Sequence, residues 1–447
     1  MRGGNRQVAL IGIEAMAILF LLGIWIHACG NHGRSSLNAP ESFTQKLLLG
    51  ILVLSPAWLT LVYLFPMPIG LWSHLPVRAA YQQLMSDVDL SSVTKLPLSL
   101  VPDATKASLL AGIPLVAAFL AGYASRLTQV RLLMTVVAGM AFLQVLLGLF
   151  QAAGDAQSTL YFTTEFAGRP FGTFANTNHY ANYIAMALTG YIWLGASSLG
   201  GLHDLDTGGL RTRFGERHAH AFWIAGGLLL LLGILMTFSR GAALSGLPAV
   251  LLAVAVALLA TGRVQSWRKL LLLLGGALAL AVSLVGVGAL TSRFDLSRMA
   301  VDASFRGLLA SSTLTGAWEF WPWGTGWGTY ASVYPRFQPV AVDGYADHAH
   351  QDYAQMLFEG GIFSVLLAVA FLWLAAGRAA RLIKAGVRKR MLEPDELASA
   401  VCGLGLLGFL LHSLVEFNMH IPANAILASL LAGVYLRPLN HPSLAVR

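Results

Sequence analysis

Charged residues are scarce in this chain. Only 11% of its 447 residues are Asp, Glu, Lys or Arg, whereas an average soluble domain carries about 25%. Hydrophobic residues make up 56% of the sequence. A soluble globular fold is therefore excluded, because so few charges fall far short of what the surface of such a domain carries.

Cysteine is almost absent as well. The sequence has two, Cys29 and Cys402, which lie far apart in or beside apolar runs. This number and spacing exclude a disulfide framework and a cysteine metal site. The net charge of +8 does not indicate nucleic-acid binding, because Lys and Arg collect in short loops, as the positive-inside rule describes.

Long apolar runs are what the sequence has in abundance. Hydrocarbon cannot hydrogen-bond a bare backbone, and continuous rather than alternating apolar runs favour helices over barrel strands. The sequence therefore predicts an all-α polytopic membrane helix bundle of about 11–12 transmembrane helices of roughly 20 residues each. The runs lie at 8–28, 47–65, 108–123, 130–150, 179–198, 221–238, 243–260, 269–290, 356–377, 397–416 and 422–437.

Basic loops set the expected orientation. The stretch 377–390 carries six Lys or Arg and is expected in the cytoplasm, which makes 291–355 a long periplasmic loop with short helices. One integral membrane domain then has three parts: transmembrane helices in 1–290, the loop 291–355 and transmembrane helices in 356–447. The same count puts the N-terminus outside although Arg2 and Arg6 precede the first helix, so either a span is missed or one of the first two segments is re-entrant.

Polar side chains gather at helix ends on the predicted outer side. Asn176, Asn178 and His179 follow Arg169 at the entry to one helix, where they either cap it or bind a polar ligand, since a helix N-terminus also favours anions. Arg240 lies in a short connection, where it either snorkels to the headgroups or forks onto a phosphate.

The return of the long loop to the membrane carries two histidines. His348 and His350 resemble half of a metal site if an aspartate joins them, but a third dedicated ligand is not evident, so neither metal nor cofactor is expected. A general-base role fits an imidazole better, with Asp352 or Glu359 fixing its tautomer.

The last outer turn, before Pro422, holds three more polar residues, Glu416, Asn418 and His420. A carboxylate at a membrane edge costs energy unless it is paired. Turn chemistry around Pro422 is the alternative interpretation.

The order of these motifs resembles that of the O-antigen ligase and Wzy-type polymerase superfamily. It runs Arg-Pro-Phe-Gly-Thr-Phe-Ala-Asn-x-Asn-His, Thr-x-Ser-Arg-Gly, an arginine before Trp-Pro-x-Gly-x-Gly-x-Gly, His-Ala-His-x-Asp-Tyr with Glu-Gly-Gly, and Glu-Phe-Asn-x-His-Ile-Pro-Ala-Asn. The resemblance covers most of the chain from about residue 90 onward. The closing motif is most similar to the branch found beside exopolysaccharide genes.

This resemblance implies a glycosyltransferase of the bacterial inner membrane with its site facing the periplasm. Such proteins pass a glycan from a polyprenyl diphosphate carrier to an acceptor hydroxyl on a glycan or lipid. The resemblance implies that His350, Arg240 and Arg306 are catalytic; Gln351 stands where many relatives have Asn. The other substrate-binding candidates are Arg169, Asn176, Asn178, His179, Trp327, His348, Asp352, Glu359 and His420. The rings of Trp321, Trp323, Trp327 and Tyr330 are expected to offer apolar faces to sugars, unless some of them belong to an interfacial belt.

Two other functions stay open. Members of the superfamily have carried a bicarbonate-transporter label, but a path for a small solute needs polar groups near mid-bilayer, and the predicted spans are almost purely apolar apart from Gln144. A structural partner in an export complex needs no clustered His and Arg. Ligation to lipid A core, polymerisation and transfer to protein are not separated by the sequence.

Overall fold

The computed structural model describes most of the chain. The described residues are 7–30, 42–89, 92–154, 160–161, 168–199, 210–260, 272, 275–276, 279, 296–342, 344–389 and 392–439. Within them the fold is a bundle of apolar helices with one small two-stranded sheet. The expected all-α polytopic architecture is confirmed.

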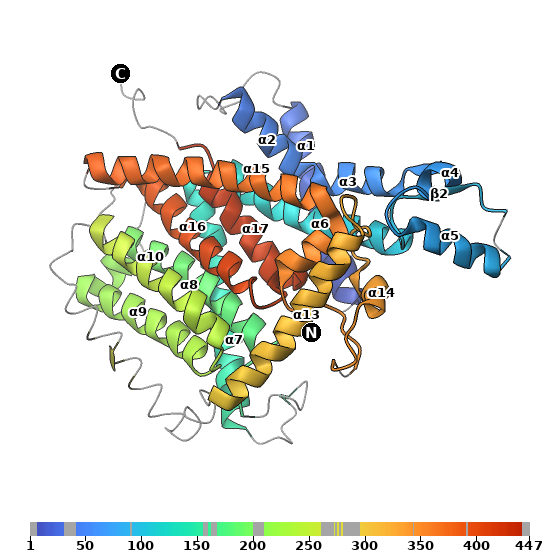
Figure 1. Ribbon diagram of the computed structural model, residues 1–447. Coiled ribbons are helices and arrows are strands. Elements are labelled where there is room, and N and C mark those ends of the chain that lie inside the picture. Colours follow the sequence, from blue (N-terminus) through green and yellow to red (C-terminus); the bar gives the residue numbers. More distant parts are fainter. Residues whose placement is uncertain are drawn as a thin grey trace.

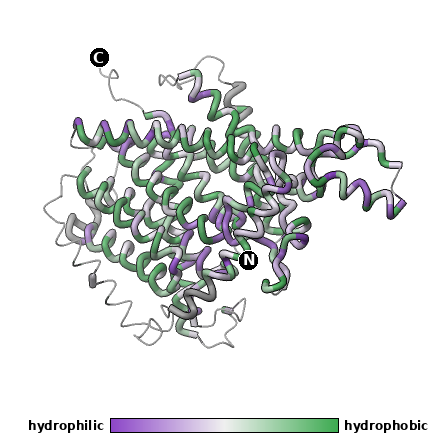
Figure 2. The backbone as a smooth tube through the Cα atoms, viewed as in Figure 1, coloured by the Kyte–Doolittle hydropathy of each residue, from purple (hydrophilic) through white to green (hydrophobic). Residues whose placement is uncertain are grey.

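Apolar helices build the bundle in chain order. They are α1 (Gln7–Gly30), α2 (Phe43–Val53), α3 (Ser55–Leu64), α6 (Pro102–Ala124), α7 (Leu127–Ala153), α8 (Thr177–Leu199), α9 (Leu210–Leu235), η2 (Ala242–Gly246), α10 (Leu247–Ala260), α15 (Asp352–Lys389), α16 (Pro394–His412) and α17 (Pro422–Leu436). Hydrophobic colour runs along these helices in Figure 2. Seven helices among the described residues are long and apolar enough to cross a membrane, or eight if the bent pair α2–α3 is one span.

Ten of the expected apolar runs coincide with these helices. The run at 269–290 lies almost wholly outside the described residues. The run at 47–65 is broken into α2 and α3, which meet at 59°, and Pro56 lies in the first turn of α3. Leu10 and Glu14 of α1 line a cavity together with His420, so α1 begins at the same end of the bundle as the turn before α17.

The expected outer segments carry more structure than the sequence predicts. Residues 66–97 form an arm that extends away from the bundle (Figure 1). In the arm, β1 (Pro66–Pro68) pairs antiparallel with β2 (Lys95–Pro97) around α4 (Ile69–Trp72) and α5 (Arg78–Asp87). The loop 291–355 holds α13 (Leu296–Glu319), α14 (Tyr330–Val333) and η4 (Tyr334–Arg336). With 24 residues, α13 is not the short helix expected there, and it runs obliquely to α15 in Figure 1.

Glycines allow α6 and α17 to pack closely. A Cβ on Gly122 would lie 2.4 Å from the Leu430 carbonyl oxygen, and one on Gly433 would lie 2.1 Å from the Phe119 carbonyl oxygen. Small residues on both helices let the two backbones approach without a hydrophobic driving force between them. This packing fixes the start of α17, and therefore the turn that precedes it.

A break in α15 receives the glycine-rich part of the long loop. Gly361 has φ of 51° inside the helix, which a glycine adopts at little cost. The break leaves backbone amides and carbonyls of α15 without partners in the helix, and the loop forms hydrogen bonds with them. The Ile362 amide donates to the Pro322 carbonyl at 2.8 Å, and the Gly326 amide donates to the Glu359 carbonyl at 2.9 Å. The glycine-rich motif is therefore a turn that docks on α15.

Gly361→Ala is expected to destabilise this docking. The new Cβ would lie 2.1 Å from the Pro322 carbonyl oxygen. In addition, a backbone with φ of 51° and ψ of −132° is sparsely populated by residues with a Cβ and costs them about 1–3 kcal/mol before any clash. A fall of several degrees in the thermal midpoint of the detergent-solubilised protein is the expected result. Gly377→Ala on the same helix is the control, because its Cβ meets nothing within 4 Å. An unchanged midpoint for Gly361→Ala would contradict this account.

Candidate active site

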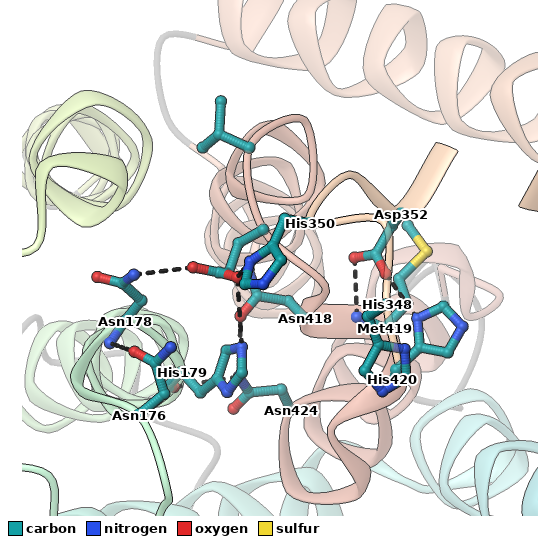
Figure 3. Close-up of polar contacts among 12 residues, drawn as sticks. Asn176, Asn178, His179, His348, His350, Asp352, Asn418, Met419, His420 and Asn424 are labelled. Carbon is teal, nitrogen blue, oxygen red and sulfur yellow. Dashed lines mark hydrogen bonds and ion pairs between the residues drawn. The ribbon is translucent and has the colours of Figure 1, made fainter. Parts of the chain in front are cut away.

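A buried carboxylate gathers side chains from three other parts of the chain. Glu416 follows α16 and is 0% exposed. Its Oε2 accepts from Asn178 Nδ2 at 2.8 Å and from Arg306 at 3.1 Å, and its Oε1 accepts from His350 Nδ1 at 2.9 Å. The His179 Nε2 atom lies 3.8 Å from Oε1, an electrostatic contact rather than a hydrogen bond. In Figure 3 the side chains of Asn178, His179 and His350 point toward one another.

This arrangement keeps the carboxyl group ionised. Burial alone would raise the pKa of Glu416, but the His179 and His350 imidazoles and the positive charge of Arg306 outweigh burial and hold its pKa well below the usual range. A buried carboxylate is tolerated only when several donors satisfy it. Arg306 also donates to the Val415 carbonyl, so the guanidinium is tied to the same turn.

His350 is held in a defined orientation by this contact. Because an ionised carboxylate only accepts hydrogen bonds, Nδ1 carries a proton, and in the neutral imidazole the lone pair is therefore on Nε2. The backbone of His350 has φ of 50°, an uncommon conformation for a residue with a Cβ and one that clusters at functional sites. The imidazole is partly exposed, at 28%. The arrangement therefore presents a basic nitrogen beside a guanidinium.

Asp352 joins the start of α15 to the last turn. Its Oδ1 accepts from His420 Nδ1 at 2.8 Å and its Oδ2 accepts from the Met419 backbone at 2.9 Å, contacts drawn in Figure 3. Burial lowers the pKa of His420, but the hydrogen bond and charge of Asp352 outweigh burial and raise it. Asp352 therefore orients His420; the tautomer of His350 is fixed by Glu416, not by Asp352 or Glu359 as the sequence suggested.

His348 lies between these two groups. Its ring stacks on Phe417 with centroids 4.5 Å apart and lies 4.8 Å from the ring of His420. Burial, followed by the influence of His420, lowers the pKa of His348 to about 3, so this imidazole is neutral at physiological pH. Gln355 links the group, because its amide contacts His348, His420 and the Ala349 backbone.

Glu359 and the neighbouring rings belong to the packing of the loop. Both oxygens of Glu359 accept from backbone amides, those of Gly328 and Tyr330, at 2.9 Å, so the side chain anchors the loop. Tyr330 is 1% exposed and stacks on Tyr334, and the expectation that it offers a face to sugars is wrong. Trp327 packs on Gly360 and lines a mostly apolar cavity of about 420 Å³ next to His420.

Arg240 lies at the same end of the bundle as His350. A Cβ on its neighbour Gly241 would lie 2.2 Å from His412 Nε2, and His412 ends α16 four residues before Glu416. Ser239 accepts from the Ala242 backbone at 3.2 Å and so helps to shape the turn that carries Arg240.

The two asparagines at the start of α8 have different roles. Asn176 Oδ1 accepts from the Asn178 backbone at 2.7 Å, which is capping, whereas the Asn178 side chain reaches Glu416. Arg169 precedes Pro170, which packs on Gly148 of α7. The structure thus brings Asn178, His179, Arg306 and His350 onto one carboxylate and gathers His348, Asp352 and His420 beside them.

Part of the chain is similar to a known protein family. Residues 225–392 match the family model of O-antigen ligase. The resemblance to the O-antigen ligase and Wzy-type polymerase superfamily is confirmed. No curated protein matches the chain. The O-antigen ligase domain and the apolar helices together support a multi-pass bacterial membrane protein that ligates or polymerises glycans.

The matched region contains only part of the candidate site. The O-antigen ligase domain contains Arg240, Arg306 and His350, whereas Asn178 and Glu416 lie outside residues 225–392. The sequence motifs predict the first three as catalytic residues, whereas Glu416 is not among the predicted site residues, although a carboxylate at a membrane edge needs a partner. That requirement was the available signal, and four polar partners now satisfy it.

Proposed function

We propose that this protein transfers a glycan from a polyprenyl diphosphate carrier to an acceptor hydroxyl at the periplasmic face of the inner membrane. The observation that carries the proposal is the hydrogen-bonded set in which Glu416 holds both the imidazole of His350 and the guanidinium of Arg306. A base and a cation beside each other suit a reaction in which a hydroxyl loses a proton and a diphosphate gains charge.

The proposed reaction is a single displacement. His350 Nε2 accepts the proton of the acceptor hydroxyl as its oxygen forms a bond to the anomeric carbon of the glycan. The bond between that carbon and the diphosphate oxygen breaks, and the configuration at carbon inverts. The imidazolium that forms is stabilised by the charge of Glu416, which stays ionised because of its lowered pKa.

Arginines are proposed to stabilise the leaving group. Arg306 is one-third exposed, so its guanidinium can contact a ligand while it stays bonded to Glu416. Arg240 lies on the turn packed against the end of α16 and is proposed to bind the same diphosphate. Cations that bind the departing diphosphate more strongly than the bound donor lower the barrier.

The direct test is transfer by the purified full-length protein in lipid vesicles supplied with a polyprenyl diphosphate-linked glycan and an acceptor glycan or lipid. Elongated or ligated glycan, with release of polyprenyl diphosphate, is the expected result. Absence of transfer to any glycan or lipid acceptor, with the protein folded, would overturn the proposal. In cells that lack the protein, the carrier-linked glycan is expected to accumulate.

Arg240→Lys is expected to slow transfer by about 10²-fold, because one ammonium cannot fork onto a phosphate as a guanidinium does. The measurement is kcat with a carrier-linked glycan in vesicles. Arg381→Lys, an exposed position near the other end of α15, is the control and should retain full activity. Equal rates for both variants would remove Arg240 from the proposed diphosphate site.

A further inference from the structure

One aromatic ring in the last turn contacts three imidazoles. The ring centroid of Phe417 lies 4.6 Å from that of His179, 4.5 Å from that of His348 and 4.8 Å from that of His350. His348 stacks on it with an interplanar angle of 19°, while His179 and His350 meet it nearly at right angles, at 77° and 86°. No sequence motif signals this contact, since the three histidines come from two distant segments.

The backbone of Phe417 is fixed on both sides. Glu416 before it is hydrogen-bonded to three separate segments of the chain, and the Met419 amide after it donates to Asp352. The Phe417 carbonyl also accepts from the His420 amide at 3.3 Å. The ring therefore stands on a rigid turn and gives its neighbours a fixed surface.

His350 needs such a surface. The hydrogen bond from Nδ1 to Glu416 fixes one atom of the ring but leaves the imidazole able to swing about that bond. A second contact, with the ring of Phe417 at 86°, defines the plane of the imidazole and therefore the direction of the Nε2 lone pair. Edge-to-face ring pairs of this kind are worth about 0.5–1.5 kcal/mol beyond burial.

We infer that Phe417 is a positioning residue that sets the plane of the His350 imidazole and so aims Nε2 at the acceptor hydroxyl. This inference rests on the proposed glycan transfer. Misplacement of a catalytic group by about 1 Å costs on the order of 10²-fold in rate. Phe417 acts through His350 and has no part in binding the diphosphate, so its loss should reduce kcat and spare the affinity for the donor.

Phe417→Leu and Phe417→Tyr test this role. Leucine removes the planar ring, and kcat is expected to fall by about 10–100-fold with the KM for the carrier-linked glycan changed less than about threefold. Tyrosine keeps the ring and is expected to restore at least half of the rate. In a His350→Ala background, the Phe417→Leu change should slow the residual transfer by less than about twofold, because residues that act as a unit are not additive.

Phe371→Leu is the matched control, since Phe371 is a partly buried phenylalanine of α15 that packs on the same core. It should lower the thermal midpoint without lowering kcat. Normal kcat for Phe417→Leu would overturn the inference. So would a parallel loss of kcat, donor affinity and thermal stability that tyrosine fails to restore, which indicates a structural role. Failure of wild-type protein to transfer glycan would instead refute the proposed function itself.

Discussion

His350→Ala is expected to slow glycan transfer by about 10²–10⁴-fold, the usual contribution of a general base. The variant loses the nitrogen that accepts the proton of the acceptor hydroxyl, while Arg240 and Arg306 remain to bind the diphosphate. Donor affinity should therefore stay within about threefold of the wild-type value while kcat falls. The measurement is single-turnover transfer of labelled glycan in vesicles, with binding of polyprenyl diphosphate measured in parallel.

His74→Ala is the control for this experiment. His74 is an exposed histidine of the arm, and its replacement should leave transfer unchanged. Near-normal transfer by the His350 variant would rule out the base role. A loss of donor binding as large as the loss of rate would assign His350 to the binding of the carrier instead.

Glu416→Gln is expected to have an effect of similar size, although Glu416 is proposed to touch neither substrate. The NH2 group of the new glutamine must face either Arg306, which is an obligate donor, together with Asn178, or His350. Facing His350 is less costly, because that imidazole can move its proton to Nε2 and accept at Nδ1. The new tautomer has no lone pair at Nε2, and a wrong tautomer of a catalytic histidine has cost about 10⁴-fold in a serine protease.

Stability against pH gives an independent check on Glu416. Its pKa is lowered in the folded protein, so its contribution to stability is present above the unfolded pKa of about 4.5 and is lost as pH falls through the folded pKa. Wild-type protein should therefore lose thermal stability below about pH 4.5, and the glutamine variant should lose less over the same range. Glu416→Asp keeps the charge and should retain more activity than glutamine. Equal activity of wild type and Glu416→Gln would refute the orienting role.

The contacts of some predicted site residues indicate a structural role instead of the catalytic or binding role that the sequence predicts. Glu359 carries a carboxylate that could act in catalysis, yet its two oxygens accept hydrogen bonds from the backbone amides of Gly328 and Tyr330. Tyr330 lies in an aromatic-rich loop typical of sugar binding, yet it is buried against Tyr334. Residue type gives the chemistry that a side chain is able to perform, but only its neighbours show whether it is free to perform it.

The sequence by itself determined the bundle of apolar helices and the identity of the reactive groups. Hydrocarbon leaves a backbone no partner but its own helix, so apolar runs such as 130–150 predict spans without tertiary information, and the order of motifs around Arg240 and His350 indicates the superfamily. Only the tertiary structure decided that Glu416 joins His350, Arg306 and Asn178, and that Phe417 lies among three histidines. Those partners are 66 to 238 residues away from Glu416 in the chain, and nothing in local sequence fixes the distance between residues so far apart, because packing of whole helices sets it.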